Sequence, residues 1–114
     1  MAENKLADLS MDFAVSILKV TDGIKGHYSL INQLERSATS IGANIREAKY
    51  AHSKADFISK LQIALKECSE TEYWLELLIE SGYYHDKMIL DKCVELKRIL
   101  IASINTAKEN KNGN

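Results

Sequence analysis

The most constraining feature of this sequence is a pair of long apolar patterns on either side of a short polar break at residues 51–56. Both patterns repeat apolar or small residues at alternating spacings of four and three. The first set is Leu34, Ala38, Ile41, Ile45 and Ala48, and the second is Phe57, Leu61, Ala64, Cys68, Thr71, Leu75 and Leu78. This spacing places each set on one side of an α-helix. The stretch therefore predicts two antiparallel helices that pack through these two seams.

Similar patterns occur before and after this stretch. The earlier stripe consists of Leu6, Leu9, Phe13, Ile17 and Val20, widened by Val15 and Leu18. The later stripe consists of Ile89, Cys93, Leu96, Leu100, Ser103 and Ala107. Residues that commonly start or stop helices separate the patterns, namely Gly23, Ser29, Ser53, Gly82 and Asp86. We therefore predict helices over 5–21, 29–50, 54–81 and 86–108, followed by a frayed tail at 109–114.

Four helices joined by short connections favour one all-α domain covering 1–114. The connections are too short to skip a neighbouring position, so we predict an antiparallel up-down-up-down four-helix bundle. The chain has 114 residues, enough for one domain and too few for two ordinary ones. The absence of proline and the presence of only five glycines argue against a fold rich in turns and β-hairpins.

The sequence indicates neither export nor a membrane partner. No apolar run approaches the roughly 18 residues that would suggest a membrane span. The first five residues, MAENK, lack the basic start and continuous apolar core of a signal peptide. We therefore expect a cytoplasmic protein.

The two cysteines are expected to be free, buried thiols. If the chain reverses direction near Tyr84, Cys93 lies beside Leu75. That register places Cys93 roughly 10 Å from Cys68 along the helix axis, at 1.5 Å per residue. A disulfide needs a much shorter separation, so each cysteine is predicted to act as a small apolar side chain.

The sequence predicts no catalytic, cofactor-binding or metal-binding residues. His27, His52 and His85 all fall in predicted turns, outside any metal-ligand spacing. No glutamate has a histidine three residues later, as a bundle-core di-iron site would require. No serine lies in a nucleophile-elbow context. We therefore expect a protein that is not an enzyme and needs no cofactor.

The middle of the second predicted helix contains unusually small side chains, at Ser37–Ser40 and Gly42–Ala43. A glycine inside a helix costs about 1 kcal/mol relative to alanine, so the patch needs a compensating reason. Small residues let a neighbouring helix approach closely, which predicts a tight crossing. The alternative, a phosphate-binding loop, lacks the spacing and the preceding strand of a P-loop.

One carboxylate, Glu72, lies on a largely apolar face of the third predicted helix. A buried carboxylate needs a partner, and Arg36 on the second helix is one candidate. If residues equidistant from the turn lie opposite each other, Arg36 lies nearer to Glu67. Contact with Glu72 would then require a shift of about one helical turn along the helix axis. We interpret Arg36 and Glu72 as a buried polar pair that fixes the register. A ligand site between the helices remains the alternative.

Apolar side chains cover nearly the whole circumference of the third helix near its end. They are Tyr73, Trp74, Leu75, Leu77, Leu78 and Ile79. A helix of this kind is either deeply buried or pressed against a second partner. Because no helix of a four-helix bundle is central, we predict an oligomer interface formed by Tyr73, Trp74 and Leu77. The alternative is that Tyr73 and Trp74 only flank the core.

The formal charge of −1 argues against a global basic field, but the charges are unevenly distributed. In an up-down bundle the second turn lies at the same end as both termini. The bases that would gather there are Arg46, Lys49, Lys54, Lys60, Lys108 and Lys111, together with Lys5. The acids that would gather at the other end are Glu76, Glu80, Asp86 and Asp91. The basic residues form a candidate nucleic-acid-binding site, and the alternative is a solvated charged surface without function.

The motif at residues 34–48, LERSATSIGANIREA, is similar to the signature of a bacterial family. These are the four-helix-bundle proteins encoded in intervening sequences of 23S ribosomal RNA genes. Residues that resemble the second motif of this family are Phe57, Leu61, Ile63, Ala64, Glu67, Glu72 and Leu75. The family is related to the accessory variability determinant proteins of diversity-generating retroelements. Those proteins form pentameric barrels that bind a reverse transcriptase and nucleic acid, so the resemblance implies a homopentamer that binds RNA or DNA.

Two functional hypotheses follow. The first is a non-enzymatic oligomeric scaffold that binds nucleic acid, a protein partner, or both, and whose basic end contacts phosphates without base-specific readout. The second is a protein-interaction adaptor, for example for a reverse transcriptase. Its recognition surface would be the aromatic face of the third helix, and it would not bind nucleic acid.

Overall fold

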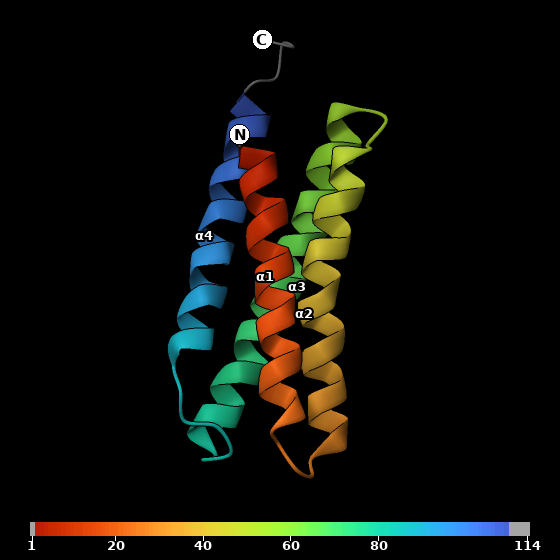
Figure 1. Cartoon of the computed structure of the whole chain (residues 1–114). Helices are drawn as coiled ribbons and strands as arrows, with labels where there is room; N and C mark the ends of the chain where they lie inside the picture. Colours follow the sequence, from red (N-terminus) through yellow and green to blue (C-terminus); the bar gives the residue numbers. More distant parts are fainter. Residues whose placement is uncertain (1, 110–114) are drawn as a thin grey trace.

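The computed structural model describes residues 2–109, and within that range the chain forms four α-helices. They are α1 (Ala2–Asp22), α2 (Tyr28–Lys49), α3 (Lys54–Glu80) and α4 (Met88–Glu109). Each helix runs antiparallel to the one before it (Figure 1). This arrangement confirms the predicted all-α up-down-up-down four-helix bundle.

The helices pack in cyclic order around one core. α1 and α3 each contact α2 and α4, whereas α1 does not contact α3 in the described part of the chain. The start of α1, the end of α4 and the α2–α3 connection lie at one end of the bundle, here called the terminal end (Figure 1). The α1–α2 and α3–α4 connections lie at the opposite end, here called the distal end. The molecule measures 50 × 20 × 19 Å along its principal axes. None of the helices in residues 2–109 is both long and apolar enough to cross a bilayer.

The helix boundaries differ from the predicted ones by three residues at most. α3 begins as predicted, because the Ser53 hydroxyl accepts a hydrogen bond from the backbone N–H of Asp56 at 3.1 Å. Asp86 likewise accepts a hydrogen bond from the backbone N–H of Met88 at 2.9 Å, just before α4. At α2 the predicted cap is wrong. The helix starts at Tyr28, and His27 precedes it in the left-handed region with φ 54°.

The predicted tail is corrected at one residue. Glu109 is still helical and ends α4, whereas residues 110–114 lie outside the described part of the chain.

The two central seams form the core as predicted. All five members of the α2 seam are buried, as are six of the seven members of the α3 seam. The exception is Phe57, which is half-buried near the start of α3. In α4, Ile104 is buried while Ser103 and Ala107 are only half-buried, because the inward face follows the buried positions 89, 93, 96, 100 and 104.

The stripe predicted for α1 is wrong at its edges. Val15 and Leu18 do not widen the core. They point outward and are 43% and 48% exposed. Two small polar residues, Ser10 and Thr21, are buried instead. The reason is geometric, since at 100° per residue positions 10 and 21 fall on the same side of the helix as Phe13 and Ile17, and positions 15 and 18 fall on the other.

The small residues of α2 allow two close helix approaches. A Cβ added to Gly42 would lie 3.3 Å from the Ser10 hydroxyl oxygen of α1, closer than most side-chain contacts. On the side toward α3, the buried Thr71 hydroxyl donates to the Ser37 hydroxyl at 2.8 Å. The predicted tight crossing is therefore present, and it involves both neighbours of α2.

The cysteines are free and buried as predicted, but their predicted separation is wrong. Cys68 lies directly opposite Cys93 across the α3–α4 seam, with the sulfur atoms 3.9 Å apart. The connection at 81–87 is centred on Tyr84 as assumed, but its last part runs back along the bundle before α4 begins at Met88, so α4 starts closer to the terminal end than α3 ends and the register shifts (Figure 1). The contact with Cys68, followed by burial, raises the pKa of the Cys93 thiol. The Cys93 thiol therefore stays protonated, and both buried cysteines pack as core side chains.

The predicted pairing of Arg36 with Glu72 is wrong. Arg36 forms ion pairs with Glu67 at 3.2 Å and with Glu70, and its side chain is half exposed. Glu72 points to the other side of α3 and pairs with Lys97 of α4 at 2.5 Å. The physical reason is that positions 67 and 70 of α3 lie toward α2, whereas position 72 lies toward α4. These pairs hold adjacent helices together at the rim of the core.

The approach of α1 to α2 predicts a penalty for any large side chain at Gly42. We expect Gly42→Leu to lower the free energy of unfolding by about 1–3 kcal/mol, because the added atoms collide with Ser10. Ala43→Leu is the matched control, since Ala43 is the next residue and is exposed. It should change stability by less than about 0.5 kcal/mol. Chemical denaturation followed by circular dichroism measures both, and equal stability of the two variants would refute a tight crossing.

The Glu72–Lys97 pair predicts a pH-dependent contribution to stability. The hydrogen bond that Lys97 donates to Glu72 raises the pKa of Lys97. The pair's contribution to the free energy of unfolding is therefore fully present below the pKa of lysine in the unfolded chain, about 10.4. It is lost as the pH rises through the higher pKa of Lys97 in the folded protein. We expect Glu72→Gln to cost about 1 kcal/mol at pH 7. Urea titrations should show this difference shrinking at pH 11.

The control for this pair is Glu95→Gln, which changes an exposed glutamate on α4. It should leave the urea midpoint unchanged at both pH values. A Glu72→Gln variant as stable as the unmodified protein at pH 7 would show that the pair contributes nothing measurable.

Candidate functional site

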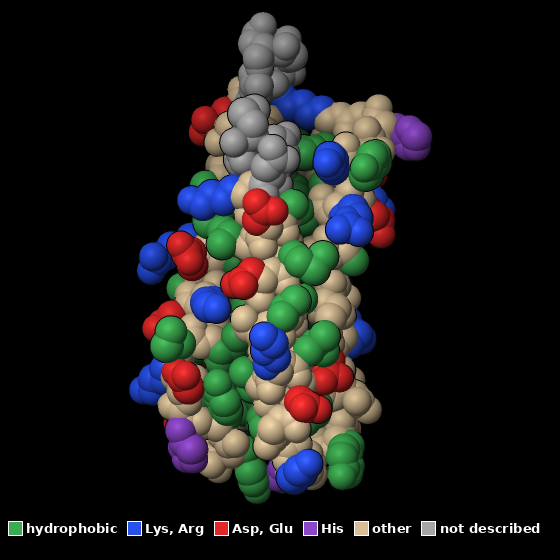
Figure 2. Space-filling model, in the orientation of Figure 1, with side chains coloured by type: hydrophobic (Ala, Val, Ile, Leu, Met, Phe, Trp, Pro, Cys, Tyr) green, Lys and Arg blue, Asp and Glu red, His purple; other side chains and the backbone are tan. Residues whose placement is uncertain are grey.

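Basic side chains from three helices meet at the terminal end. The last turn of α2 supplies Arg46 and Lys49, the start of α3 supplies Lys54, and the last turn of α4 supplies Lys108. All four are exposed. Blue side chains gather around the α2–α3 connection at the top of Figure 2. The structure thus places Arg46, Lys49, Lys54 and Lys108 at one end of the bundle, whereas Lys111 lies outside the described residues.

Acidic neighbours reduce the positive field at this end. Lys60 is half-buried and forms an ion pair with Glu47 at 3.2 Å, so its charge is largely compensated. Asp56 lies in the first turn of α3, and Glu109 ends α4. The strongest local positive potential is therefore expected around Arg46 and Lys49, which lie less than one helical turn apart on α2.

An exposed aromatic side chain accompanies these bases and was missed in the sequence analysis. Tyr50 is 72% exposed, and the Lys49 ammonium lies 5.9 Å from the centre of its ring. A tyrosine between basic residues in a polar turn is the signal that could have identified it. Exposed aromatic rings beside cations can stack on unpaired bases while the cations contact phosphates.

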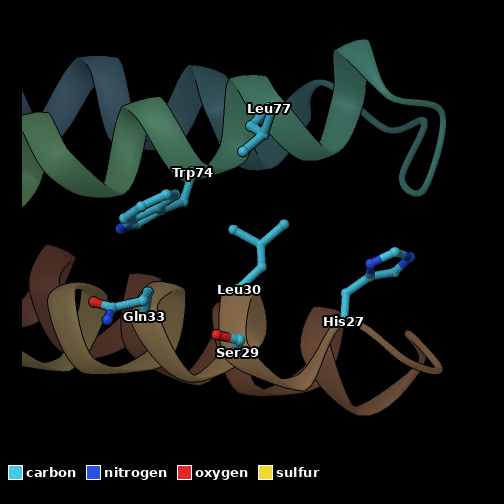
Figure 3. Close-up of a pocket in the computed structure, with 6 residues that line it drawn as sticks. All are labelled: His27, Ser29, Leu30, Gln33, Trp74 and Leu77. Carbon is cyan, nitrogen blue, oxygen red and sulfur yellow. The ribbon is translucent and has the colours of Figure 1, made fainter.

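A second candidate surface is a shallow groove of about 340 Å³ between α2 and α3 near the distal end. Its lining residues are His27, Ser29, Leu30, Gln33, Trp74 and Leu77. Figure 3 shows Leu30 of α2 extending toward Trp74 and Leu77 of α3, with His27 at the open end. The groove is apolar along its centre and polar at its margins, which suits a protein side chain better than a charged ligand.

The three residues predicted as an oligomer interface differ in exposure. Tyr73 and Leu77 are 58% and 38% exposed. Trp74 is half-buried, packs against the core, and donates from its indole N–H to Glu70 at 3.3 Å. Trp74 therefore belongs partly to the fold, as the alternative interpretation proposed, while Tyr73 and Leu77 are available for a partner.

Arg36 is linked to the indole ring of Trp74 through the carboxylate of Glu70. The Glu70 carboxylate that accepts the Trp74 hydrogen bond also pairs with Arg36. These contacts raise the pKa of the Arg36 guanidinium, the hydrogen bond to Glu70 contributing most. Glu72, on the opposite side of α3, takes no part in this network. The two residues proposed as one buried polar site therefore act at two separate places.

The histidines do not come together with other metal-ligand side chains. His27 packs its ring against Tyr83, with the ring centres 4.0 Å apart, at the distal end. His52 lies in the α2–α3 connection at the terminal end, on the far side of the bundle. In the described part of the chain, no group of three or more His, Cys, Asp or Glu side chains is arranged to hold a metal ion.

Comparisons with known proteins point to one family. Residues 2–102 match the family described as 23S rRNA-intervening sequence protein. The chain is also similar to a crystal structure of a protein of unknown function from the S23 ribosomal protein family of Bacteroides thetaiotaomicron. The two share 45% sequence identity with a TM-score of 0.85, and the similarity covers 92% of this chain and 99% of that chain. Among curated proteins, no match was found.

The family match covers α1, α2, α3 and most of α4, including the small-residue motif of α2 and the α3 seam that form the core. The sequence resemblance is therefore confirmed, and this chain belongs to the 23S rRNA-intervening sequence protein family.

Proposed function

We propose that this protein is a non-enzymatic scaffold that assembles with copies of itself and binds nucleic acid through the terminal end. The observation that carries the proposal is the convergence of exposed bases from α2, α3 and α4 on one end of a chain with a net charge of −1. Acidic residues 76, 80, 86 and 91 lie toward the distal end, so the molecule is electrically polarised along its axis. A phosphate backbone would be attracted to one end and repelled from the other.

The chemistry of the basic end suits backbone contacts. Arg46 and Lys49 are flexible exposed cations, which contact phosphates without reading base edges. Tyr50 beside them adds a ring on which an unpaired base can stack. The preferred ligand is therefore a structured RNA with unpaired bases, or single-stranded DNA, bound with little sequence preference.

Family membership supports this proposal. The family takes its name from intervening sequences of 23S ribosomal RNA genes, which links its members to RNA-encoding loci. The resemblance to retroelement accessory proteins implies a homopentamer. In a ring of parallel subunits the basic ends would adjoin, and a weak positive patch on each chain would become a continuous rim.

A filter-binding titration with structured RNA tests the nucleic-acid part. We expect binding at low salt whose affinity falls steeply as salt rises, because phosphate binding releases counterions. The variant Arg46→Glu/Lys49→Glu should weaken binding at least about tenfold and reduce the magnitude of the salt slope by about 2.

The matched control reverses the same number of charges at the distal end, in Lys25→Glu/Lys87→Glu. It has the same net charge as the test variant and should bind RNA much as the unmodified protein does. Absence of binding at low salt, or equal loss in both variants, would refute binding by the terminal end.

The groove between α2 and α3 favours a second candidate function, a protein-interaction adaptor that does not bind nucleic acid. An apolar centre formed by Leu30, Trp74 and Leu77 could accept a side chain of a partner such as a reverse transcriptase. Co-purification of a partner protein that survives nuclease treatment and is lost in Leu77→Asp would favour the adaptor. RNA binding by the purified protein in the absence of any partner protein would favour the scaffold.

A further inference from the structure

We propose that Cys68 and Cys93 form a reversible disulfide between α3 and α4 of one chain when a hydroperoxide oxidises them. The ion pair between Glu72 and Lys97 controls how readily the oxidant reaches the two sulfur atoms. Neither role depends on self-assembly or on nucleic-acid binding.

The two cysteines lie side by side in the contact between α3 and α4. Each Sγ lies 3.5 Å from the backbone carbonyl oxygen of the other cysteine, and the two sulfur atoms are 3.9 Å apart. Each sulfur therefore already reaches the main chain of the opposite helix, so the two side chains overlap and do not meet tip to tip. A disulfide holds its sulfur atoms about 2.0 Å apart, so each sulfur has to move by only about 1 Å. Rotation about the Cα–Cβ bonds supplies this movement while the helices keep their register.

The pairing of these thiols is fixed by the fold. The chain has two cysteines, and both are completely buried between the helices of one bundle. Sulfur atoms of two folded chains cannot meet there, so the disulfide is intrachain. The two residues are 25 positions apart, and a bond between them restricts mainly the unfolded chain. The oxidised protein is therefore expected to be more stable than the reduced protein.

The Glu72–Lys97 ion pair crosses over the cysteine contact. Glu72 follows Cys68 by four residues on α3. Lys97 follows Cys93 by four residues on α4. Because the two helices are antiparallel, these positions lie about 6 Å to either side of the cysteines along the bundle axis. The side chains nevertheless pair at 2.5 Å, so together they extend along the α3–α4 seam past the thiols.

This ion pair is the part of the seam that solvent reaches. The side chains of Glu72 and Lys97 are 19% and 30% exposed, whereas the thiols beneath them are fully buried. An exposed ion pair contributes little stability, so it opens more easily than the apolar core. Opening it removes the side chains that cover the sulfur atoms.

The closed seam keeps the thiols unreactive. The contact with Cys68, followed by burial, raises the pKa of the Cys93 thiol, while the Lys97 ammonium acts in the opposite direction. Since the thiolate is the reactive form, oxidation has to wait until the seam opens. Once Lys97 has separated from Glu72, its ammonium is free to stabilise a thiolate beside it. The ion pair therefore sets both the access of the oxidant and the reactivity of the sulfur.

The oxidation takes two steps. One thiolate attacks an oxygen of the hydroperoxide, the O–O bond breaks, and a sulfenic acid forms. The departing oxygen takes up a proton and leaves as an alcohol, or as water when hydrogen peroxide is the oxidant. The second sulfur then attacks the sulfenic sulfur, the S–O bond breaks, and water leaves. The two thiols lose two electrons and two protons in total, which reduce the hydroperoxide, and a thiol reductant reverses the bond by exchange.

Intact mass spectrometry of the purified full chain tests the disulfide. The protein is treated with hydrogen peroxide under native conditions, then denatured, and its remaining thiols are alkylated. We expect a single chain that is lighter by two hydrogen atoms and takes up no label, and that takes up two labels after treatment with dithiothreitol. The oxidised form should melt at least about 5 °C above the reduced form.

The controls are Cys68→Ala and Cys93→Ala, each compared with and without peroxide. Neither variant should gain thermal stability from the treatment. Two free thiols in the treated unmodified chain, a disulfide between two chains, or an oxidised form that melts no higher than the reduced form would each overturn the proposal.

The rate of disulfide formation tests the role of the ion pair. Glu72→Gln keeps the size of the side chain but weakens its contact with Lys97, so the disulfide should form at least about threefold faster. Gly42→Leu is the matched control, because it destabilises the contact between α1 and α2, away from this seam. It should leave the rate unchanged. Equal acceleration in both variants would show that oxidation requires global unfolding. That result, or no acceleration in Glu72→Gln, would overturn control by the ion pair.

Discussion

The close packing of α2 between its two neighbours is the constraint on which the rest of this bundle depends. Small side chains let α2 approach both helices, with Gly42 against Ser10 of α1 and Ser37 bonded to Thr71 of α3. Such packing excludes water from the centre of the bundle, so the buried hydroxyls bond to each other or to backbone carbonyls. It also fixes the register of α1, α2 and α3, and therefore the height at which every surface residue of those helices lies.

Ion pairs at the rim of the core set the orientation of α3 relative to its neighbours. Arg36 reaches across to Glu67 and Glu70, and Glu70 in turn holds the indole of Trp74 at the edge of the groove. On the other side of α3, Glu72 and Lys97 secure α4. Each of these ion pairs at the rim contributes about 1 kcal/mol or less, and together they tie α3 to both of its neighbours. The orientation of α3 in turn determines which of its apolar residues face outward.

The functional proposals follow from the consequences of this geometry. An up-down bundle gathers alternate connections at one end, so bases that are scattered along the sequence converge at the terminal end. The same bundle places α1 and α3 at opposite corners, each with an outer face that carries apolar residues. A scaffold that assembles through its sides and contacts phosphates with its terminal end would use both properties.

Much of the fold could be read from the sequence, because helical periodicity is a local property. The α2 and α3 seams, the Ser53 cap and the conflict between Gly42 and helix formation were all visible in the spacing of residues. The position of the bases at one end of the bundle followed from the number of predicted helices, because alternate connections of an up-down bundle lie at the same end. Ion-pair partners and the facing cysteines could not be read in this way. They depend on the register between helices, and the part of the α3–α4 connection that runs back along the bundle shifted the residue opposite Cys93 by seven positions, from Leu75 to Cys68. The exposure of Val15 and Leu18 was likewise decided only when α1 packed, because a helix with apolar residues on two faces can bury just one of them in a four-helix bundle.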